Sequence, residues 1–318
     1  MTFNFARNNV FWQSSAGLKG SSLLMFAKKN LTYIRVTLLL IWLTIFFASA
    51  RPLSLLFDYG SFAFLGVIGA IFANATGAGG GVVFVPFFNQ LEFSSLTSVA
   101  TSFAIQCCGM TAGALTWWAF YRTEHQQSLE WNSINKVLLF TVPMSVLGLL
   151  LVQFNAQFFT HISQPDSLHI GFGMFSIVLA LAIFATIPLL KNDRFNNHLS
   201  IADLYLLPLI ALVGGGITAW LSIGVGELVA VYLIMRRFNI AFAIATAVII
   251  SAFTVWAGVA FHIVETQAIY WPVVMFAGAG AIMGGVLAKR LVLYFSAKNL
   301  KIFFAAWIFI LGLTAIPM

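Results

Sequence analysis

Two glycine-rich sequences interrupt long apolar stretches of this chain, and each could bind an anion through its backbone. The first is GAGGG at 77–81, and the second is GVG at 224–226. Glycine releases the chain from helical geometry, so we expect new helices to begin at about Val82 and about Glu227. The first backbone N–H groups of a helix lack partners within it and carry about half a positive charge. Two such helix starts would form an anion site without a basic side chain.

Hydroxyl and amide side chains beside the breaks and on the helices that follow them would complete this site. Each hydroxyl has an alternative role, because intramembrane Ser and Thr commonly bond the carbonyl four residues earlier in their own helix. The predicted substrate-binding residues are Asn74, Thr76, Gly77, Ala78, Gly79, Gly80, Gly81, Thr101, Ser102, Ser222, Gly224, Val225, Gly226 and Thr246.

Glu227 is the one acidic residue expected at membrane depth. An ionised carboxylate is costly there and repels an anion, so Glu227 is protonated, caps the helix start, or couples transport to a proton. Cys107 and Cys108 lie on a following helix, where small buried packing is the simpler role. The sequence has no nucleophile with its base, aspartate dyad or HExxH motif, so we expect no catalytic residue, metal site or cofactor.

The composition is that of a helical membrane protein. Of the 318 residues, 61% are hydrophobic and 8% are charged, whereas soluble domains have about 25% charged residues. The net charge of +7 is spread over short loops rather than along one helix face, so it indicates membrane topology and not a nucleic-acid partner.

Both breaks lie in apolar runs of unusual length. The two runs have 29 and 32 residues, which as single helices would measure ~44 to 48 Å against a hydrocarbon core of ~30 Å. Non-helical backbone at that depth must be buried in protein or line a cavity, so we predict re-entrant hairpins. The nine apolar runs are 33–50, 62–90, 96–121, 134–154, 168–190, 204–235, 240–264, 273–295 and 302–318.

The distribution of basic residues favours the hairpins. Nine full spans with two broken helices, the alternative fold, would leave five of the 16 Lys and Arg residues outside. With re-entrant hairpins only Arg51 is outside, which agrees better with the positive-inside rule. Three full spans then separate the hairpins, so the second unit is inverted relative to the first.

The predicted all-α fold has four parts: a cytoplasmic arm at 1–32, a first span at 33–50, and inverted repeats at 61–190 and 203–318. Each repeat is a glycine-broken hairpin followed by three transmembrane helices. An offset of 147 aligns Gly77 with Gly224, and an offset of 145 aligns Thr101 with Thr246. The sequence ASA at 48–50 resembles a signal-peptidase site, and an uncleaved first span is the alternative.

The GAGGG break, Pro86 and the sequence ATS at 100–102, followed by a weaker second copy, resemble the TauE/SafE family of sulfite and organosulfonate exporters. The resemblance implies a multi-pass protein of the bacterial plasma (inner) membrane that exports sulfite, sulfoacetate or a related sulfonate. Uptake of the same anions is the alternative, and an ion channel fits less well. Glu227 and Leu228 replace glycines expected in the second copy, and Leu233 stands opposite Pro86, which leaves the substrate open.

Overall fold

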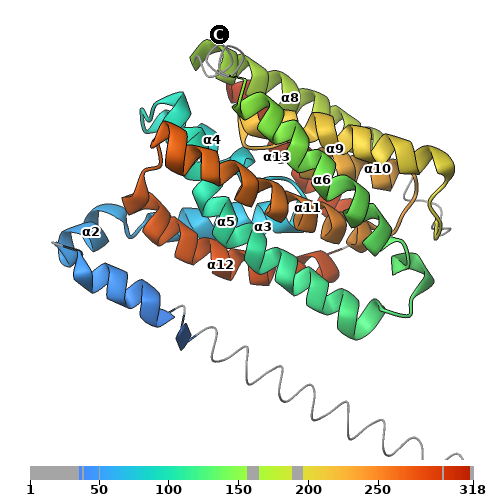
Figure 1. Ribbon diagram of the computed structural model, residues 1–318, viewed down its shortest axis with the longest axis horizontal. Coiled ribbons are helices and arrows are strands. Elements are labelled where there is room, and N and C mark those ends of the chain that lie inside the picture. The colour runs from blue at the N-terminus through green and yellow to red at the C-terminus, as the bar shows by residue number, and fades with distance from the viewer. Residues whose placement is uncertain are drawn as a thin grey trace, which may run out of the picture. The chain divides into compact units, whose positions relative to one another are not determined.

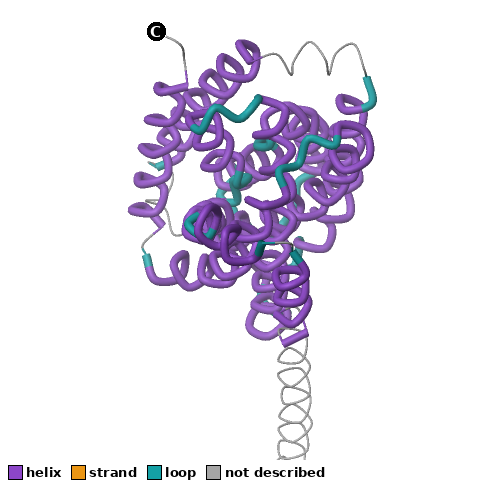
Figure 2. The backbone as a smooth tube through the Cα atoms, turned by 90° about the vertical axis from the view of Figure 1, so that its left-hand side faces the viewer, coloured by secondary structure: helices purple, strands orange, loops and turns teal. Residues whose placement is uncertain are grey.

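The computed structural model describes residues 36–37, 39–49, 51–155, 165–187, 196–295 and 297–315. These residues form helices and loops, with no strand among them (Figure 2). The arm predicted at 1–32 and the start of the first predicted span lie outside the described residues. The chain divides into two compact units, Met1–Phe57 and Asp58–Met318.

The first unit contains a helix at Leu39–Ala48 and most of α2 (Pro52–Tyr59). The two helices bend by 111° and together are long and apolar enough to form one span. Most of their apolar side chains are exposed, as Phe57 is at 84%, whereas Phe46 is buried at 8%.

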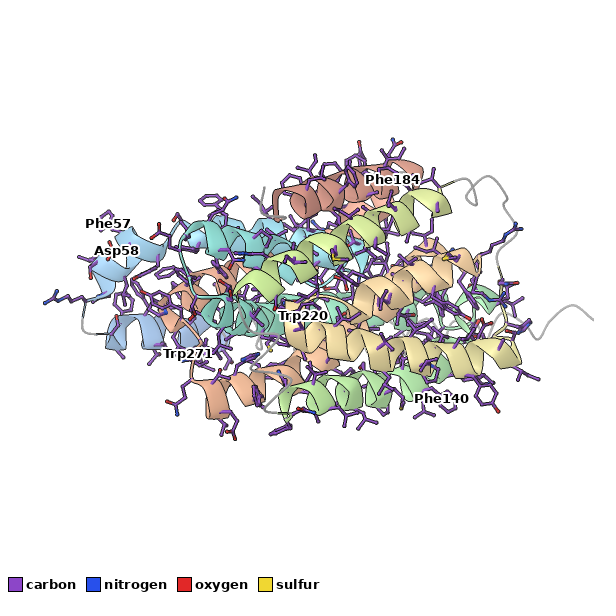
Figure 3. The ribbon with its side chains drawn as sticks, turned by 90° about the horizontal axis from the view of Figure 1, so that it is seen from above. Phe57, Asp58, Phe140, Phe184, Trp220 and Trp271 are labelled. Carbon is purple, nitrogen blue, oxygen red and sulfur yellow. The ribbon has the colours of Figure 1, made fainter. Side chains whose placement is uncertain are left out.

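The second unit is a bundle in which the long helices run side by side (Figures 1 and 3). Six helical stretches of the described chain are long and apolar enough to cross a bilayer, so the protein is a multi-pass membrane protein. Phe140 on the outer surface is 46% exposed, as expected for a side chain that faces lipid (Figure 3). The helices are α3 (Phe62–Thr76), α4 (Gly81–Gln90), α5 (Ser95–Phe120), α6 (Ile134–Gln153), α8 (Pro165–Thr186), α9 (Ile201–Leu221), α10 (Val225–Met235), α11 (Ile240–Phe261), α12 (Trp271–Tyr294) and α13 (Ala297–Ala315).

The first broken segment folds back on itself. Helix α3 ends at Gly77, whose φ of 80° lies in the left-handed region that glycine adopts without strain. Helix α4 begins at Gly81, one residue before the predicted start. The ring of Phe62, at the start of α3, lies 6.3 Å from the rings of Phe87 and Phe88 near the end of α4. The two ends of the segment are therefore neighbours, and α3 and α4 form a hairpin.

The second broken segment is also a hairpin. Helix α9 ends at Ser222, which has a left-handed φ of 60°, and α10 begins at Val225, two residues before the predicted start. The N–H of Asn196, which precedes α9, donates to the carbonyl of Arg237, which follows α10, at 2.9 Å. A continuous helix of this length would hold those residues far apart, so the hydrogen bond shows that the segment turns back.

Each hairpin packs against a helix of the other half of the chain. Helix α3 packs along α12, and α9 packs along α6. Glycines bring the backbones close together, as small residues do in membrane helices. A Cβ atom on Gly66 of α3 would lie 1.9 Å from the carbonyl oxygen of Ala277, and one on Gly148 of α6 would lie 1.9 Å from that of Leu212.

A buried carboxylate joins the two ends of the second hairpin. Asp203, in the first turn of α9, has no exposed side-chain surface. It accepts hydrogen bonds from the Tyr232 hydroxyl at 2.6 Å, from Arg236 Nε at 2.7 Å, and from the Ser200 N–H and hydroxyl, both at 2.8 Å. The hydrogen bond to Asp203 raises the pKa of Arg236, which keeps the guanidinium charged. Asp203 therefore holds α10 against the start of α9.

We expect Asp203→Ala to lower stability by about 2 kcal/mol or more, because it leaves the Tyr232 hydroxyl and the Ser200 N–H without their acceptor. The thermal unfolding midpoint of the detergent-purified protein measures the effect. Asp58→Ala, at an exposed acid, is the control and should leave the midpoint unchanged. Equal midpoints for the two variants would contradict the role of Asp203.

Candidate functional site

The tips of the two hairpins, residues 77–81 and 222–226, are in direct backbone contact inside the bundle. A Cβ atom on Gly226 would lie 2.0 Å from the carbonyl oxygen of Gly77. A Cβ atom on Gly81 would lie 2.5 Å from the carbonyl oxygen of Ser222. The tips meet this closely because these positions carry no side chain. The two predicted breaks therefore come together in one buried place.

The Glu227 carboxylate connects the two tips. Its Oε1 atom accepts a hydrogen bond from the Gly79 N–H at 2.7 Å, and its Oε2 atom accepts one from the Gly224 N–H at 2.8 Å. The bond to Gly224 is the N-cap interaction that a glutamate in the first helical turn makes with the residue before its helix. The bond to Gly79 reaches 148 positions back along the chain. The side chain is 3% exposed, so the whole arrangement is shielded from solvent.

Gln106 on α5 forms a second connection between the tips. Its Oε1 atom accepts from the Gly80 N–H at 2.7 Å, and its Nε2 atom donates to the hydroxyls of Ser222 at 2.7 Å and Ser102 at 3.0 Å. We did not predict Gln106 from the sequence. A carboxamide in the middle of an apolar span, four residues after Ser102, is the signal that points to it.

Two hydroxyls accept further hydrogen bonds from backbone N–H groups at the tips. The Thr76 hydroxyl accepts from the Ala78 N–H at 2.9 Å and also donates to the carbonyl of Phe72, four residues earlier, at 2.8 Å. The Thr218 hydroxyl accepts from the Val225 N–H at 3.0 Å. Thr218 is a further residue that sequence reasoning missed.

Five backbone N–H groups at the tips thus donate to acceptors of the protein itself. They belong to Ala78, Gly79, Gly80, Gly224 and Val225. The structure shows the tips in a conformation in which side chains occupy the donors expected to face an anion.

Two of the predicted residues join helices away from the tips. The Asn74 side chain is fully buried and donates to the carbonyl of Gly109 on α5 at 3.3 Å. The Thr101 hydroxyl accepts from the N–H of Tyr270, just before α12, at 3.0 Å. These bonds position the helices that surround the tips.

Helix α11 presents Ala247 and Ser251 to the tips. A Cβ atom on Gly77 would lie 2.7 Å from the Cβ of Ala247, and one on Gly226 would lie 2.5 Å from the Ser251 hydroxyl. Thr246 is buried without a hydrogen-bond partner, and it lies about 100° around the helix from Ala247. The thiol of Cys107 contacts the carbonyl of Val255 at 3.5 Å, so it packs between α5 and α11.

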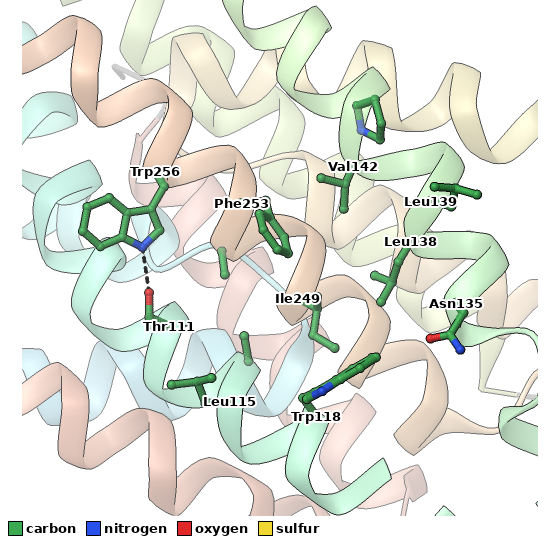
Figure 4. A pocket seen from close by; sticks show the side chains of 13 residues that line it. Thr111, Leu115, Trp118, Asn135, Leu138, Leu139, Val142, Ile249, Phe253 and Trp256 are labelled. Carbon is green, nitrogen blue, oxygen red and sulfur yellow. Dashed lines mark hydrogen bonds between the residues drawn. The ribbon is translucent and has the colours of Figure 1, made fainter. Parts of the chain in front are cut away.

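A separate pocket of about 690 Å³ lies among α5, α6 and α11 (Figure 4). Its walls are apolar, and the Thr111 hydroxyl on its edge accepts a hydrogen bond from Trp256 Nε1 at 2.8 Å. No residue of either tip lines it. The pocket therefore lies apart from the backbone N–H donors of the tips.

No group of three or more His, Cys, Asp or Glu side chains in the described ranges is placed to hold a metal ion. The polar chemistry around the tips consists of backbone N–H groups, hydroxyls, one carboxamide and one carboxylate. Such a set binds an anion by hydrogen bonds, with the partial charge of two helix starts in support.

A comparison with protein families matches residues 62–315 to the family described as Sulfite exporter TauE/SafE. The searches of curated proteins and of solved structures found no match. The matched segment contains both hairpins, Gln106 and Glu227, and it extends over most of the 318 residues. Proteins of this family are membrane transporters of the sulfite and sulfonate type rather than enzymes. The chain therefore belongs to the TauE/SafE sulfite exporter family.

Proposed function

We propose that this protein exports a small sulfur-containing anion, such as sulfite, sulfoacetate or a related sulfonate, across the bacterial plasma membrane. The observation that carries the proposal is the carboxylate of Glu227, which accepts hydrogen bonds from both hairpin tips of a TauE/SafE family member. Two tips that donate hydrogen bonds to the Glu227 carboxylate in this way also have the donors to bind a different anion.

The chemistry of the tips suits reversible binding. Residues 77–81 and 222–226 include no Lys or Arg. A transport site must bind its ion well enough to replace water and weakly enough to release it on the other side. Backbone N–H groups and hydroxyls meet both needs, because they supply hydrogen bonds without a fixed positive charge.

The membrane potential supports export. With the cell interior negative, each unit of negative charge that moves outward gains ~2.3 kcal/mol per 100 mV, which corresponds to a concentration ratio of roughly fifty. Export of a monoanion therefore needs no coupling ion. Uptake of the same anions is the second candidate, because Glu227 is an ionisable group at the tips that a proton could use.

The inverted-repeat arrangement is part of the proposal. Helices α5, α6 and α8 lie between the two hairpins, and three crossings invert the second hairpin relative to the first. The reciprocal packing of α3 on α12 and of α9 on α6 supports a repeat. The first hairpin exits beside Glu92 and the second beside Arg236 and Arg237, as expected for opposite membrane sides.

We expect opposite accessibility for two exposed loop positions. Leu91 follows the first hairpin and His198 precedes the second. In a variant without Cys107 and Cys108, Leu91→Cys should react with an impermeant maleimide added to intact cells, whereas His198→Cys should react only after permeabilisation. Labelling of His198→Cys in intact cells would contradict the inverted topology.

We expect proteoliposomes that contain the purified protein to release sulfite or sulfoacetate. The expected efflux rises when a potassium diffusion potential makes the interior negative, because the moving species is anionic. Liposomes without protein measure leakage, and chloride and sulfate test selectivity. Efflux equal to the leakage for every sulfur anion would refute the proposed function.

We expect Gly226→Ala to lower efflux by at least about tenfold, because its Cβ would meet the Gly77 carbonyl oxygen at 2.0 Å and force the tips apart. Gly216→Ala is the matched control on α9, where a Cβ meets nothing closer than a Val152 methyl group at 3.3 Å. Size-exclusion profiles establish that both variants fold. Equal efflux from the two variants would show that close contact of the tips is not required.

A further inference from the structure

Glu227 occupies two N–H groups that an anion would also need, and its role in transport rests on the proposed function. We propose that the transported anion takes the place of the Glu227 carboxylate between the two tips, that protonation of Glu227 frees this place, and that the Ser251 hydroxyl is a third donor to the anion.

The first argument is the geometry of the carboxylate. Its two oxygens accept from different hairpins, at 2.7 Å from Gly79 and at 2.8 Å from Gly224. Hydrogen bonds of this length to an ionised acceptor are strong ones. A sulfonate or sulfite also carries its charge on several oxygens around one centre. It can therefore accept from the same two N–H groups, but only after the carboxylate has left them.

The second argument is the unpaired hydroxyl of Ser251. This side chain is 2% exposed, and its hydroxyl has no hydrogen-bond partner. A buried polar group without a partner is costly, so it calls for an explanation. The Ser251 hydroxyl lies 2.5 Å from the position that a Cβ on Gly226 would occupy, so it points at the second tip. A third oxygen of a bound anion would provide the missing partner, whereas neither oxygen of the Glu227 carboxylate is bonded to Ser251.

The position of Ser251 in the chain adds to this argument. The offset of 145 that aligns Thr101 with Thr246 also aligns Gln106 with Ser251. Gln106 donates hydrogen bonds at the second tip and accepts one from the first. Both halves of the chain therefore place a polar side chain at the same position beside the tips, and Ser251 is the one that is left unpaired.

The third argument is electrostatic. Helices α3, α4 and α11 carry no titratable side chain. The hydroxyl of Tyr232 donates a hydrogen bond to the carboxylate of Asp203, toward the end of α10 that lies away from Glu227. The other elements around the tips carry these titratable residues: Cys107 and Cys108 on α5, Asp166 and His169 on α8, Asp203 and Tyr205 on α9, and Tyr232 on α10.

None of these residues is a Lys or Arg that could balance a second negative charge beside Glu227. Helix α12, which packs on α3 and α5, carries Lys289 and Arg290 near its end. The Lys289 ammonium lies over the ring of Phe120, 4.6 Å from its centre, at the end of α5 and not at Gln106, which bonds the tips. Two anionic groups in one buried site repel each other strongly, because the dielectric constant there is low. A proton taken up from the aqueous side converts Glu227 to the neutral acid. The tips therefore hold the charge of the Glu227 carboxylate before a monoanion binds and the charge of the monoanion afterwards. The two charges are not present together, which avoids the repulsion.

The test compares sulfoacetate efflux at about pH 6 and about pH 8, equal on both sides of the proteoliposome membrane. Sulfoacetate stays ionised over this range, so a change in rate reports on the protein. We expect wild-type efflux to fall at least about fivefold at the higher pH, since each pH unit changes the ratio of protonated to ionised carboxyl tenfold. Glu227→Gln should keep its efflux at both pH values and exceed the wild type at about pH 8. Glu265→Gln, at an exposed acid in the turn that follows α11, should behave as the wild type.

A binding measurement tests Ser251 independently. We expect Ser251→Ala not to lower the thermal midpoint of the free protein, because the hydroxyl it removes is buried without a partner. The sulfoacetate concentration needed for half-maximal thermal stabilisation should rise about tenfold, the ratio that corresponds to 1.4 kcal/mol. Its pH profile of efflux should match the wild type.

The outcomes separate the inference from the proposed function. A wild-type pH profile in Glu227→Gln, or loss of efflux at both pH values in a folded Glu227→Gln protein, would overturn the role of Glu227. Unchanged sulfoacetate binding in Ser251→Ala would overturn the third donor. Wild-type protein that neither releases nor is stabilised by sulfoacetate or sulfite would refute the proposed function, and the inference with it.

Discussion

The hydrogen bonds of the Glu227 carboxylate to Gly79 and Gly224 are the interaction on which the rest of this structure depends. A buried charge is tolerated only when it is paired or fully hydrogen-bonded. Here one carboxylate satisfies an N–H group of each hairpin tip, and those N–H groups would be costly to leave unpaired. The partial positive charge of two helix starts further stabilises the carboxylate. The tips and the carboxylate therefore stabilise each other.

This arrangement requires the hairpins to be held accurately at both ends. Glycines at the tips allow their backbones to touch, as the close approach of Gly226 to the Gly77 carbonyl oxygen shows. At the open end of the second hairpin, Asp203 holds α10 against α9. Rings at the open end of the first hairpin pack together instead. The contacts at the open end of each hairpin thus help to set the position of its tip.

The sequence was sufficient to predict features that depend on local composition. The helical class, the two breaks, and a helix that restarts within two residues of the expected position follow from apolar length and glycine. Of the three roles predicted for Glu227, the helix cap corresponds to its hydrogen bond with the Gly224 N–H. The hydrogen bond of Glu227 with the Gly79 N–H depends on how distant helices meet, so the sequence alone did not predict it. Gln106 escaped prediction for the same reason, because its partners are defined by packing between segments. Thr218 escaped although its partner Val225 is nearby in the chain, because the geometry of the turn decides which hydroxyl meets the Val225 N–H. The packing of Thr101 against Tyr270 likewise involves residues 169 positions apart.

Under the proposed exchange, selectivity among anions follows from N–H donors that already have an acceptor, the Glu227 carboxylate. An anion that replaces the carboxylate must accept a hydrogen bond from each N–H group that the carboxylate leaves. Otherwise a buried donor stays unpaired, which is energetically costly. The N–H groups of Gly79 and Gly224 now reach two separate oxygens. A monatomic anion such as chloride offers one centre to both, whereas a sulfonate offers separate oxygens and one more for Ser251. Under the proposed exchange with Glu227, the site favours anions with several oxygens around one atom, and it needs no fixed positive charge at the tips.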